Sequence, residues 1–199
     1  MLKIAVFGGT FNPIHNGHVH MVRQFAEKIG ADQVLLIPTS VPPHKQADDL
    51  ASAQDRLEMC RLAFPEERFR VSDLEIRRGG PSYTSDTLRE LKKLYPDSEL
   101  YLITGEDMFL TLDHWYEPEV IFSFATVCAA PRSWDGCEPL QNCAKKLQQM
   151  GAKTLIADIR FLPISSTMVR EAVKEGNNIS GLVPKAVESY ILEHHLYLE

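Results

Sequence analysis

The feature that most limits how this chain can fold is a short strand that runs directly into a glycine-rich loop. Residues Leu2–Phe7 are mostly apolar or β-branched and have the length of an ordinary strand, which the pair Gly8-Gly9 ends. Apolar residues return at helical spacing after His18, at Val19, Val22, Phe25, Ala26 and Ile29. The pattern predicts a strand, a tight loop and a helix.

This unit is typical of a site that binds an anion. In an open α/β sheet a ligand lies beyond the carboxyl end of a strand, where the next helix points free N–H groups and its positive dipole toward the ligand. Gly8 and Gly9 have no Cβ, so a phosphate could approach their backbone closely, and Pro13 stiffens the loop. His15 and His18 would flank the phosphate from the loop and from the start of the helix.

The histidines of this loop also fit two alternative roles. The loop lacks the Gly-Lys-Ser/Thr of a Walker motif and is not the G-x-G-x-x-G dinucleotide fingerprint. His15, His18 and His20 could bind zinc, but loop histidines without a partnering Glu or a Cys pair are weak evidence for a metal. A plain turn with surface histidines is the second alternative.

Composition excludes several classes of protein. With 199 residues, 44% of them hydrophobic, the chain can bury one full core, so we expect a single domain over residues 1–199. A net charge of −6 argues against non-specific nucleic-acid binding. No apolar run approaches the roughly 20 residues of a membrane span, and the first run is too short for a signal peptide. The four cysteines form no C-x-x-C pair and are expected as reduced thiols. We therefore expect a cytoplasmic protein that binds neither nucleic acid nor membrane.

Apolar periodicity predicts the remaining elements. The expected strands are 33–38, 69–76, 99–104 and 124–129, followed by a last strand region at 154–157 and 161–162. The expected helices are 53–64, one that begins after the capping residues of 81–87, 138–151, one from about Ser166, and 184–198. Strands that alternate with helices predict an α/β fold: a Rossmann-like, doubly wound parallel sheet flanked by helices, in one domain with C-terminal helices.

Candidate ligand-binding residues follow the expected strands. Two prolines present His44 and Lys45 on a stiff arm after the second strand, although the residues alone favour an ordinary solvated cation for Lys45. Gly105 permits close contact, and the carboxylate of Asp107 could meet a ribose hydroxyl or a metal. At the start of the helix near Ser166, two hydroxyls share a face with Arg170. That arrangement predicts a second anion site.

Three motifs carry a resemblance that covers essentially the whole chain. The segment GGTFNPIHNGH at 8–18 resembles the HxGH nucleotidyltransferases, and within them it looks most like bacterial nicotinate-nucleotide adenylyltransferases. The segment ISSTMVR at 164–170 resembles the second signature of the same superfamily, which binds ATP phosphates. The segment SYTSDT at 82–87 resembles a signature of the nicotinate-nucleotide enzymes.

The resemblance implies a reaction and a set of site residues. ATP and nicotinate mononucleotide would give nicotinate adenine dinucleotide and pyrophosphate in NAD biosynthesis, with Mg²⁺ carried by the ATP phosphates and with His15 and His18 as catalytic residues. The implied ATP-binding residues are Gly8, Gly9, Thr10, Phe11, His15, His18, Lys45, Gly105, Asp107, Ile164, Ser165, Ser166, Thr167 and Arg170. The implied residues for the nicotinate nucleotide are Thr10, His44, Tyr83, Thr84, Trp115 and Arg132.

Several of these assignments have alternatives. Tyr83 and Thr84 could cradle the nicotinate carboxylate through backbone N–H groups or belong to a run of simple helix caps. A lone Trp115 is more often a core residue than a platform for the nicotinate ring. The chain departs from the family at Asn12, where Asp is commoner, at Glu106, where a small residue is usual, and in the loop 133–136.

The sequence also leaves rival functions and the assembly state open. The rivals are adenylyl transfer to nicotinamide mononucleotide or phosphopantetheine, and a non-catalytic nucleotide sensor on the same fold. A homodimer is a candidate assembly, although no residue pattern indicates an oligomeric state.

Overall fold

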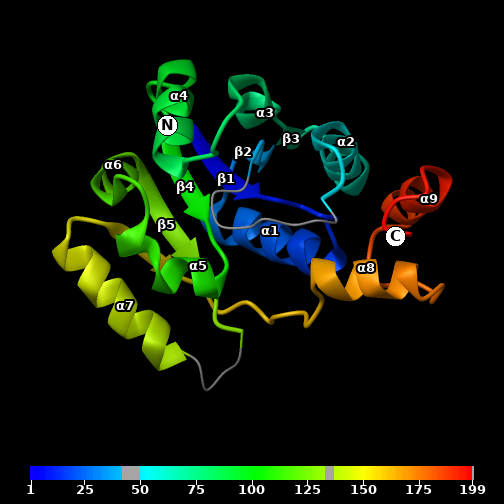
Figure 1. The fold of residues 1–199 in the computed structure, drawn as a ribbon. Helices are drawn as coiled ribbons and strands as arrows, with labels where there is room; N and C mark the ends of the chain where they lie inside the picture. The colour runs from blue at the N-terminus through cyan, green and yellow to red at the C-terminus, as the bar shows by residue number, and fades with distance from the viewer. Residues whose placement is uncertain (42–49, 133–136, 199) are drawn as a thin grey trace.

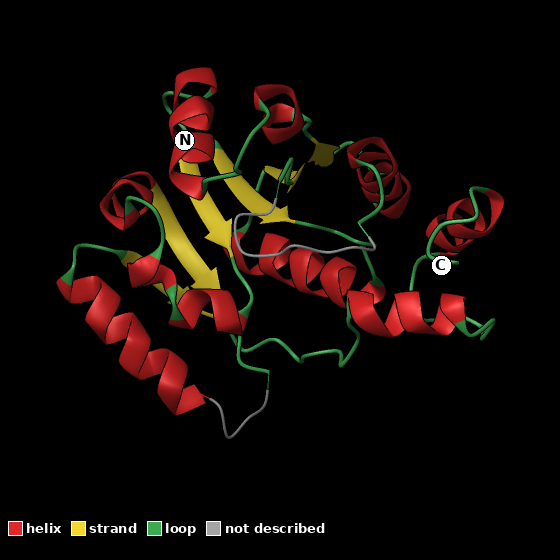
Figure 2. Ribbon diagram, viewed as in Figure 1, coloured by secondary structure: helices red, strands yellow, loops and turns green. Residues whose placement is uncertain are grey.

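The computed structural model describes residues 1–41, 50–132 and 137–198. In these residues one sheet of six strands runs in the order β3-β2-β1-β4-β5-β6, with every neighbouring pair parallel. The strands are β1 Lys3–Gly9, β2 Gln33–Pro38, β3 Phe69–Val71, β4 Glu99–Ile103, β5 Ala125–Ala129 and β6 Lys153–Ile156 (Figures 1 and 2). This order is that of the Rossmann fold, which confirms the predicted doubly wound sheet.

Helices cover both faces of the sheet. They are α1 Asn16–Ile29, α2 Ala53–Ala63, α3 Leu74–Arg78, α4 Thr84–Leu94, α5 Glu106–Leu110, α6 Pro118–Phe124, α7 Cys137–Gln149, α8 Ser166–Lys174 and α9 Lys185–Glu193, with the 3₁₀ helix η1 at Leu112–His114. One face packs against α1, α2, α8 and α9, and the other against α3 to α7 (Figure 1). No helix in the described ranges is long and apolar enough to cross a membrane.

The central strand shows why the sheet is buried on both sides. In β1, Ala5 and Phe7 belong to the core shared with α1, whereas Ile4 and Val6 belong to the core on the opposite face. All four side chains are at most 5% exposed. The continuous apolar runs that predicted the strands arise from this double burial.

The topology places a ligand crevice between β1 and β4. The chain winds outward from β1 to β2 and β3 in one direction and from β4 to β5 and β6 in the other. In folds of this kind, ligands bind beyond the carboxyl ends of the strands at that switch point.

The strand predicted at 69–76 is wrong in its second half. Only Phe69–Val71 pairs with β2, and Leu74–Arg78 forms α3. Asp73 is the N-cap of α3, where its carbonyl accepts a hydrogen bond from Arg77 N at 2.8 Å and its carboxylate pairs with the Arg77 side chain. These local bonds stabilise a helix where a strand was predicted. Helix α3 buries Leu74 and Glu75.

Two further predictions need correction. Phe161 and Leu162 are not in a strand, because the chain turns there and Ile164 N donates to Leu162 O at 2.8 Å. The last helix ends at Glu193 rather than at residue 198, because the chain turns back and Leu196 N donates to Ile191 O. Helix α6, which the periodicity did not predict, begins with Pro118.

Candidate active site

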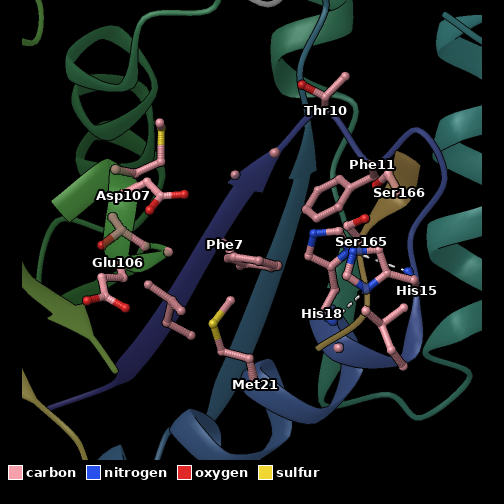
Figure 3. Close-up of a pocket in the computed structure, with 18 of the residues that line it drawn as sticks. Phe7, Thr10, Phe11, His15, His18, Met21, Glu106, Asp107, Ser165 and Ser166 are labelled. Carbon is pink, nitrogen blue, oxygen red and sulfur yellow. Dashed lines mark hydrogen bonds between the residues drawn. The ribbon is translucent and has the colours of Figure 1, made fainter. Parts of the chain in front are cut away.

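A cavity of about 730 Å³ lies beyond the carboxyl ends of β1 and β4 (Figure 3). Every predicted site residue that the structure describes lines it: Gly8, Gly9, Thr10, Phe11, His15, His18, Tyr83, Thr84, Gly105, Asp107, Trp115, Arg132, Ile164, Ser165, Ser166, Thr167 and Arg170. The predicted residues His44 and Lys45 lie outside the described part of the chain. Residues from both ends of the sequence therefore meet at one site.

The two histidines form a reciprocal cap at the start of α1. His15 is the N-cap, and its Nδ1 accepts a hydrogen bond from His18 N at 3.3 Å. In return His18 Nδ1 accepts from His15 N at 3.3 Å, and the two rings stack with centroids 3.6 Å apart (Figure 3). Because Nδ1 accepts in both rings, the proton of each neutral imidazole is on Nε2, which makes Nε2 a donor for a ligand.

His15 is held in its neutral form by burial. Its side chain is 5% exposed, and desolvation lowers its pKa from 6.5 to about 4. At neutral pH this residue can therefore donate one hydrogen bond to an anion without carrying charge of its own.

Gly17 allows the cap to close. A Cβ at this position would lie 3.0 Å from His15 Nδ1 and 3.3 Å from the carbonyl oxygen of Leu162. Both distances are tighter than ordinary van der Waals contact, and the backbone carbonyl cannot move away as a flexible side chain could. The glycine between the two histidines is therefore needed for the packing of the His15 ring.

The start of α8 contacts the loop after β1. Ser166 Oγ donates to Pro13 O at 2.9 Å, and Arg170 Nη1 donates to Asn12 O at 2.9 Å. The predicted shared face of Ser166 and Arg170 is therefore present, and it is turned toward two successive carbonyls of the loop. Ser165 Oγ caps the helix by accepting from Met168 N at 3.2 Å.

Acidic residues after β4 contact Arg132 at the end of β5. Asp107 pairs with the Arg132 guanidinium at 2.6 Å, and Glu106 Oε2 accepts from Arg132 N at 2.6 Å. The guanidinium also lies over the Phe161 ring, 5.6 Å from its centroid. Glu106, which departs from the family pattern, therefore holds the backbone of Arg132, the residue that the resemblance assigns to the nicotinate nucleotide.

The start of α4 forms part of the cavity wall. Tyr83 is the N-cap, and its side chain makes no capping hydrogen bond. The Tyr83 ring lies 4.5 Å from the Tyr116 ring, centroid to centroid. Trp115 lines the cavity and is also half-buried against the core, so the stacking role on the nicotinate ring stays a prediction.

Sequence reasoning missed Glu75 beneath this wall. Its side chain is 5% exposed and lines the cavity, and Thr87 Oγ1 donates to its carboxylate at 2.6 Å. Burial raises the pKa of Glu75, while the hydroxyls of Thr87 and Ser82 act in the opposite direction. A buried acid in a segment with the pattern of a half-exposed strand gave no usable signal. Tyr116, a second missed residue, could have been suspected from its place beside Trp115.

The zinc alternative has no geometric support in the ranges that the structure covers. No group of three or more His, Cys, Asp or Glu side chains there could hold a metal ion. His20 instead has its Nε2 2.9 Å from the carbonyl oxygen of Arg160.

Comparison with protein families defines the class. A family model described as cytidylyltransferase-like matches residues 6–172, which include both histidines and the start of α8. The parallel sheet, the cavity at its switch point and this match together define a nucleotidyltransferase of the cytidylyltransferase-like class.

Similar proteins identify the family within this class. A "Probable nicotinate-nucleotide adenylyltransferase" of Synechococcus sp. (strain JA-3-3Ab) is 44% identical over 99% of this chain and 95% of its own length. A protein of the same name from Dehalococcoides mccartyi (strain CBDB1) is 39% identical over 98% of this chain and 97% of its own. The chain belongs to the nicotinate-nucleotide adenylyltransferase family.

A solved structure shares the fold at lower sequence identity. The nicotinic acid mononucleotide adenylyltransferase of Plasmodium falciparum complexed with NaAD matches with a TM-score of 0.80 and 19% identity. The match covers 99% of this chain and 98% of that one. It confirms the α/β architecture.

Proposed function

We propose that this protein transfers the adenylyl group of ATP to nicotinate mononucleotide, which gives nicotinate adenine dinucleotide and pyrophosphate for NAD biosynthesis. The observation that carries the proposal is the convergence of three distant motifs, at 8–18, 82–87 and 164–170, on one cavity. The volume of that cavity, about 730 Å³, is in the range of small-molecule sites.

The chemistry asks little of the protein beyond alignment and charge stabilisation. The 5′-phosphate of the mononucleotide is already a nucleophile, so no general base is required. One of its oxygens attacks the α-phosphorus of ATP, and the bond from that phosphorus to the bridging oxygen breaks as pyrophosphate leaves. The site must hold the two oxygens in line and stabilise the charge that gathers on the phosphoryl group.

We assign the phosphate side of the cavity to ATP. The Nε2 donors of His15 and His18 would contact the α-phosphate oxygens from the start of α1, where the helix dipole also favours an anion. Lys45, Arg170 and the α8 start at Ser166-Thr167 would hold the β- and γ-phosphates. Gly8 is exposed at the end of β1, which supports close approach of the nucleotide to that backbone.

We assign the α4 side of the cavity to the nicotinate mononucleotide. The backbone N–H groups of Tyr83 and Thr84 lie at a helix start that the Tyr83 side chain does not cap, which suits a carboxylate. The indole face of Trp115 would stack on the electron-poor pyridine ring. His44 and Arg132 would contact the remainder of this nucleotide.

Mg²⁺ fits this site as an ion carried by the substrate. The described residues offer no set of three acidic, histidine or cysteine side chains for a dedicated metal site, so the triphosphate oxygens and water would be its ligands. Bound there, the ion would neutralise part of the charge that develops on the phosphates. The homodimer and the cytoplasmic location stay predictions.

Pyrophosphate release tests the proposal. Purified protein is incubated with ATP, Mg²⁺ and nicotinate mononucleotide, and each component is omitted in turn. The proposal expects release only with all components present, and a product with the mass of nicotinate adenine dinucleotide. A nucleotide sensor would bind ATP and release no pyrophosphate with any acceptor.

A further inference from the structure

The C-terminal end of the chain reaches the loop that follows β1. Tyr197 OH donates a hydrogen bond to Asn12 Oδ1 at 2.9 Å, across 185 residues of sequence. The same oxygen accepts from Ala51 N at 3.0 Å. Asn12 is 5% exposed and lies between Phe11 and His15 on the cavity wall.

Packing of the C-terminal segment holds Tyr197 in place. Helix α9 is anchored by Val187 and Ile191, both fully buried, and the chain then turns back through the hydrogen bond from Leu196 N to Ile191 O at 3.0 Å. The Tyr197 ring packs against the core that α9 shares with α1. Burial raises the pKa of the Tyr197 phenol, so its hydroxyl keeps the proton that it donates to Asn12.

The backbone of the same loop is held at three positions by side chains of α2 and α8. Arg56, only 1% exposed, donates through Nη1 to Thr10 O at 2.8 Å. Arg170 donates to Asn12 O and Ser166 to Pro13 O, both at 2.9 Å. The loop carbonyls are therefore fixed by α2 and α8, and the contact from Tyr197 fixes the one polar side chain between Phe11 and His15.

We propose that Tyr197 is a positioning residue for the transfer reaction: by holding the side chain of Asn12, it sets the placement of the loop that joins Gly9 to the His15 cap. This proposal rests on the function proposed above. It adds a role for the last turn of the chain, which contacts no ligand in this assignment.

Placement of this loop matters more for rate than for fold. Transfer needs the α-phosphate and its attacking oxygen aligned closely, and small displacements of the groups that hold them cost large factors in rate. The loop carries Thr10, Phe11 and His15, all assigned to the ATP side. Loss of one side-chain contact to the loop is therefore expected to appear in turnover as well as in stability.

The chain offers a matched control for Tyr197. Tyr190 also belongs to the C-terminal segment, and its OH donates to Asp55 Oδ1 at 3.0 Å, in α2 rather than in the loop. Tyr197→Phe and Tyr190→Phe each remove one hydroxyl and keep the ring. We expect the two variants to lower the melting temperature by similar amounts. Only Tyr197→Phe should also lower kcat for pyrophosphate release, by about fivefold.

A double-mutant cycle decides whether the effect passes through Asn12. In an Asn12→Ala background, Tyr197→Phe should cause no further loss of kcat, because its partner is already absent. Tyr190→Phe should leave kcat unchanged in both backgrounds and should lower the melting temperature by the same amount in each. Equal kcat values for Tyr197→Phe and Tyr190→Phe, or full additivity of Tyr197→Phe with Asn12→Ala, would overturn the proposal.

Failure of the proposed function gives a different result from failure of the positioning role. If the wild type releases no pyrophosphate, the reaction assignment is wrong, and the dissociation constant for ATP in the same variants becomes the readout. Weaker ATP binding in Tyr197→Phe than in Tyr190→Phe would then retain the positioning role. Equal binding would reject it.

Discussion

His15 and His18 each accept a hydrogen bond from the backbone N–H of the other, with their rings stacked 3.6 Å apart. Each ring is therefore oriented by a backbone N–H group at the helix start itself. The spacing of three residues is what allows this exchange, since it matches the distance from an N-cap to the third helical residue. Because Nδ1 of both rings accepts in this exchange, the proposal assigns the contact with phosphate to Nε2.

Replacement of His18 by alanine removes one of these donors. We expect the transfer rate to fall roughly ten- to a hundredfold, which corresponds to loss of one hydrogen bond to a charged phosphate. Sequence alone suggests little loss of stability, but the reciprocal cap raises the expected loss of unfolding free energy to about 1 kcal/mol. Steady-state kinetics and chemical denaturation measure the two quantities. Near-normal turnover in this variant would refute the catalytic role.

Burial of His15 makes stability depend on pH in a defined window. Its folded pKa of about 4 lies below the unfolded value of 6.5, so the unfolded state binds more protons between these values. The contribution of His15 is therefore complete above pH 6.5 and is lost as pH falls to 4, by up to ~3 kcal/mol at about 1.4 kcal/mol per pKa unit. Denaturation of the wild type and of His15→Gln across this range isolates the effect. Parallel pH profiles for the two proteins would contradict it.

Alanine substitutions at Gly17 and Gly105 distinguish an effect on packing from an effect on ligand binding. In Gly17→Ala the new Cβ would crowd His15 and the Leu162 carbonyl, so we expect a loss of about 1–3 kcal/mol in stability together with loss of activity. Gly105 has φ of −70° and no heavy atom within 4 Å of an added Cβ. For Gly105→Ala we expect an unchanged melting temperature and a raised Michaelis constant for ATP. A melting temperature that drops equally in both variants would show that this contrast is wrong.

Trp115 is expected to act on one substrate only. Trp115→Ala should raise the Michaelis constant for nicotinate mononucleotide more than that for ATP, since the indole is assigned to the pyridine ring. Trp115→Phe keeps an aromatic face and should restore part of the affinity. Because Trp115 also packs on the core, equal changes for both substrates would favour a purely structural role.

Much of the fold could be predicted because local pattern and burial agree. The apolar runs predicted as the first two strands correspond to β1, which begins one residue later at Lys3, and to β2. The loop where strand periodicity changes to helical periodicity lines the cavity. The prediction for 69–76 failed because apolar residues alternate with polar ones on both sides of Ser72-Asp73. The contacts of the Asp73 carbonyl and carboxylate with Arg77, which favour a helix there, are not visible in that pattern. Helix α6 was missed although Pro at its first position is a known helix signal.

Contacts between distant residues explain what the sequence could not indicate. The sequence marks Asn12 only as a departure from the family pattern, and its hydrogen bonds to Ala51 and Tyr197 depend on packing that no local pattern encodes. The pairing of Asp107 with Arg132 joins residues that were assigned to different substrates. Motifs therefore predict which residues form the site, whereas the contacts between these residues depend on tertiary packing.

One measurement tests the central claim most directly: pyrophosphate release with ATP and Mg²⁺, with nicotinate mononucleotide, nicotinamide mononucleotide and phosphopantetheine offered in parallel. We predict a strong preference in kcat/KM for nicotinate mononucleotide, because the proposal assigns the backbone N–H groups at the start of α4 to its carboxylate. Preference for either other acceptor would contradict the assignment of the α4 wall, and no release with any of the three would contradict the proposed function itself.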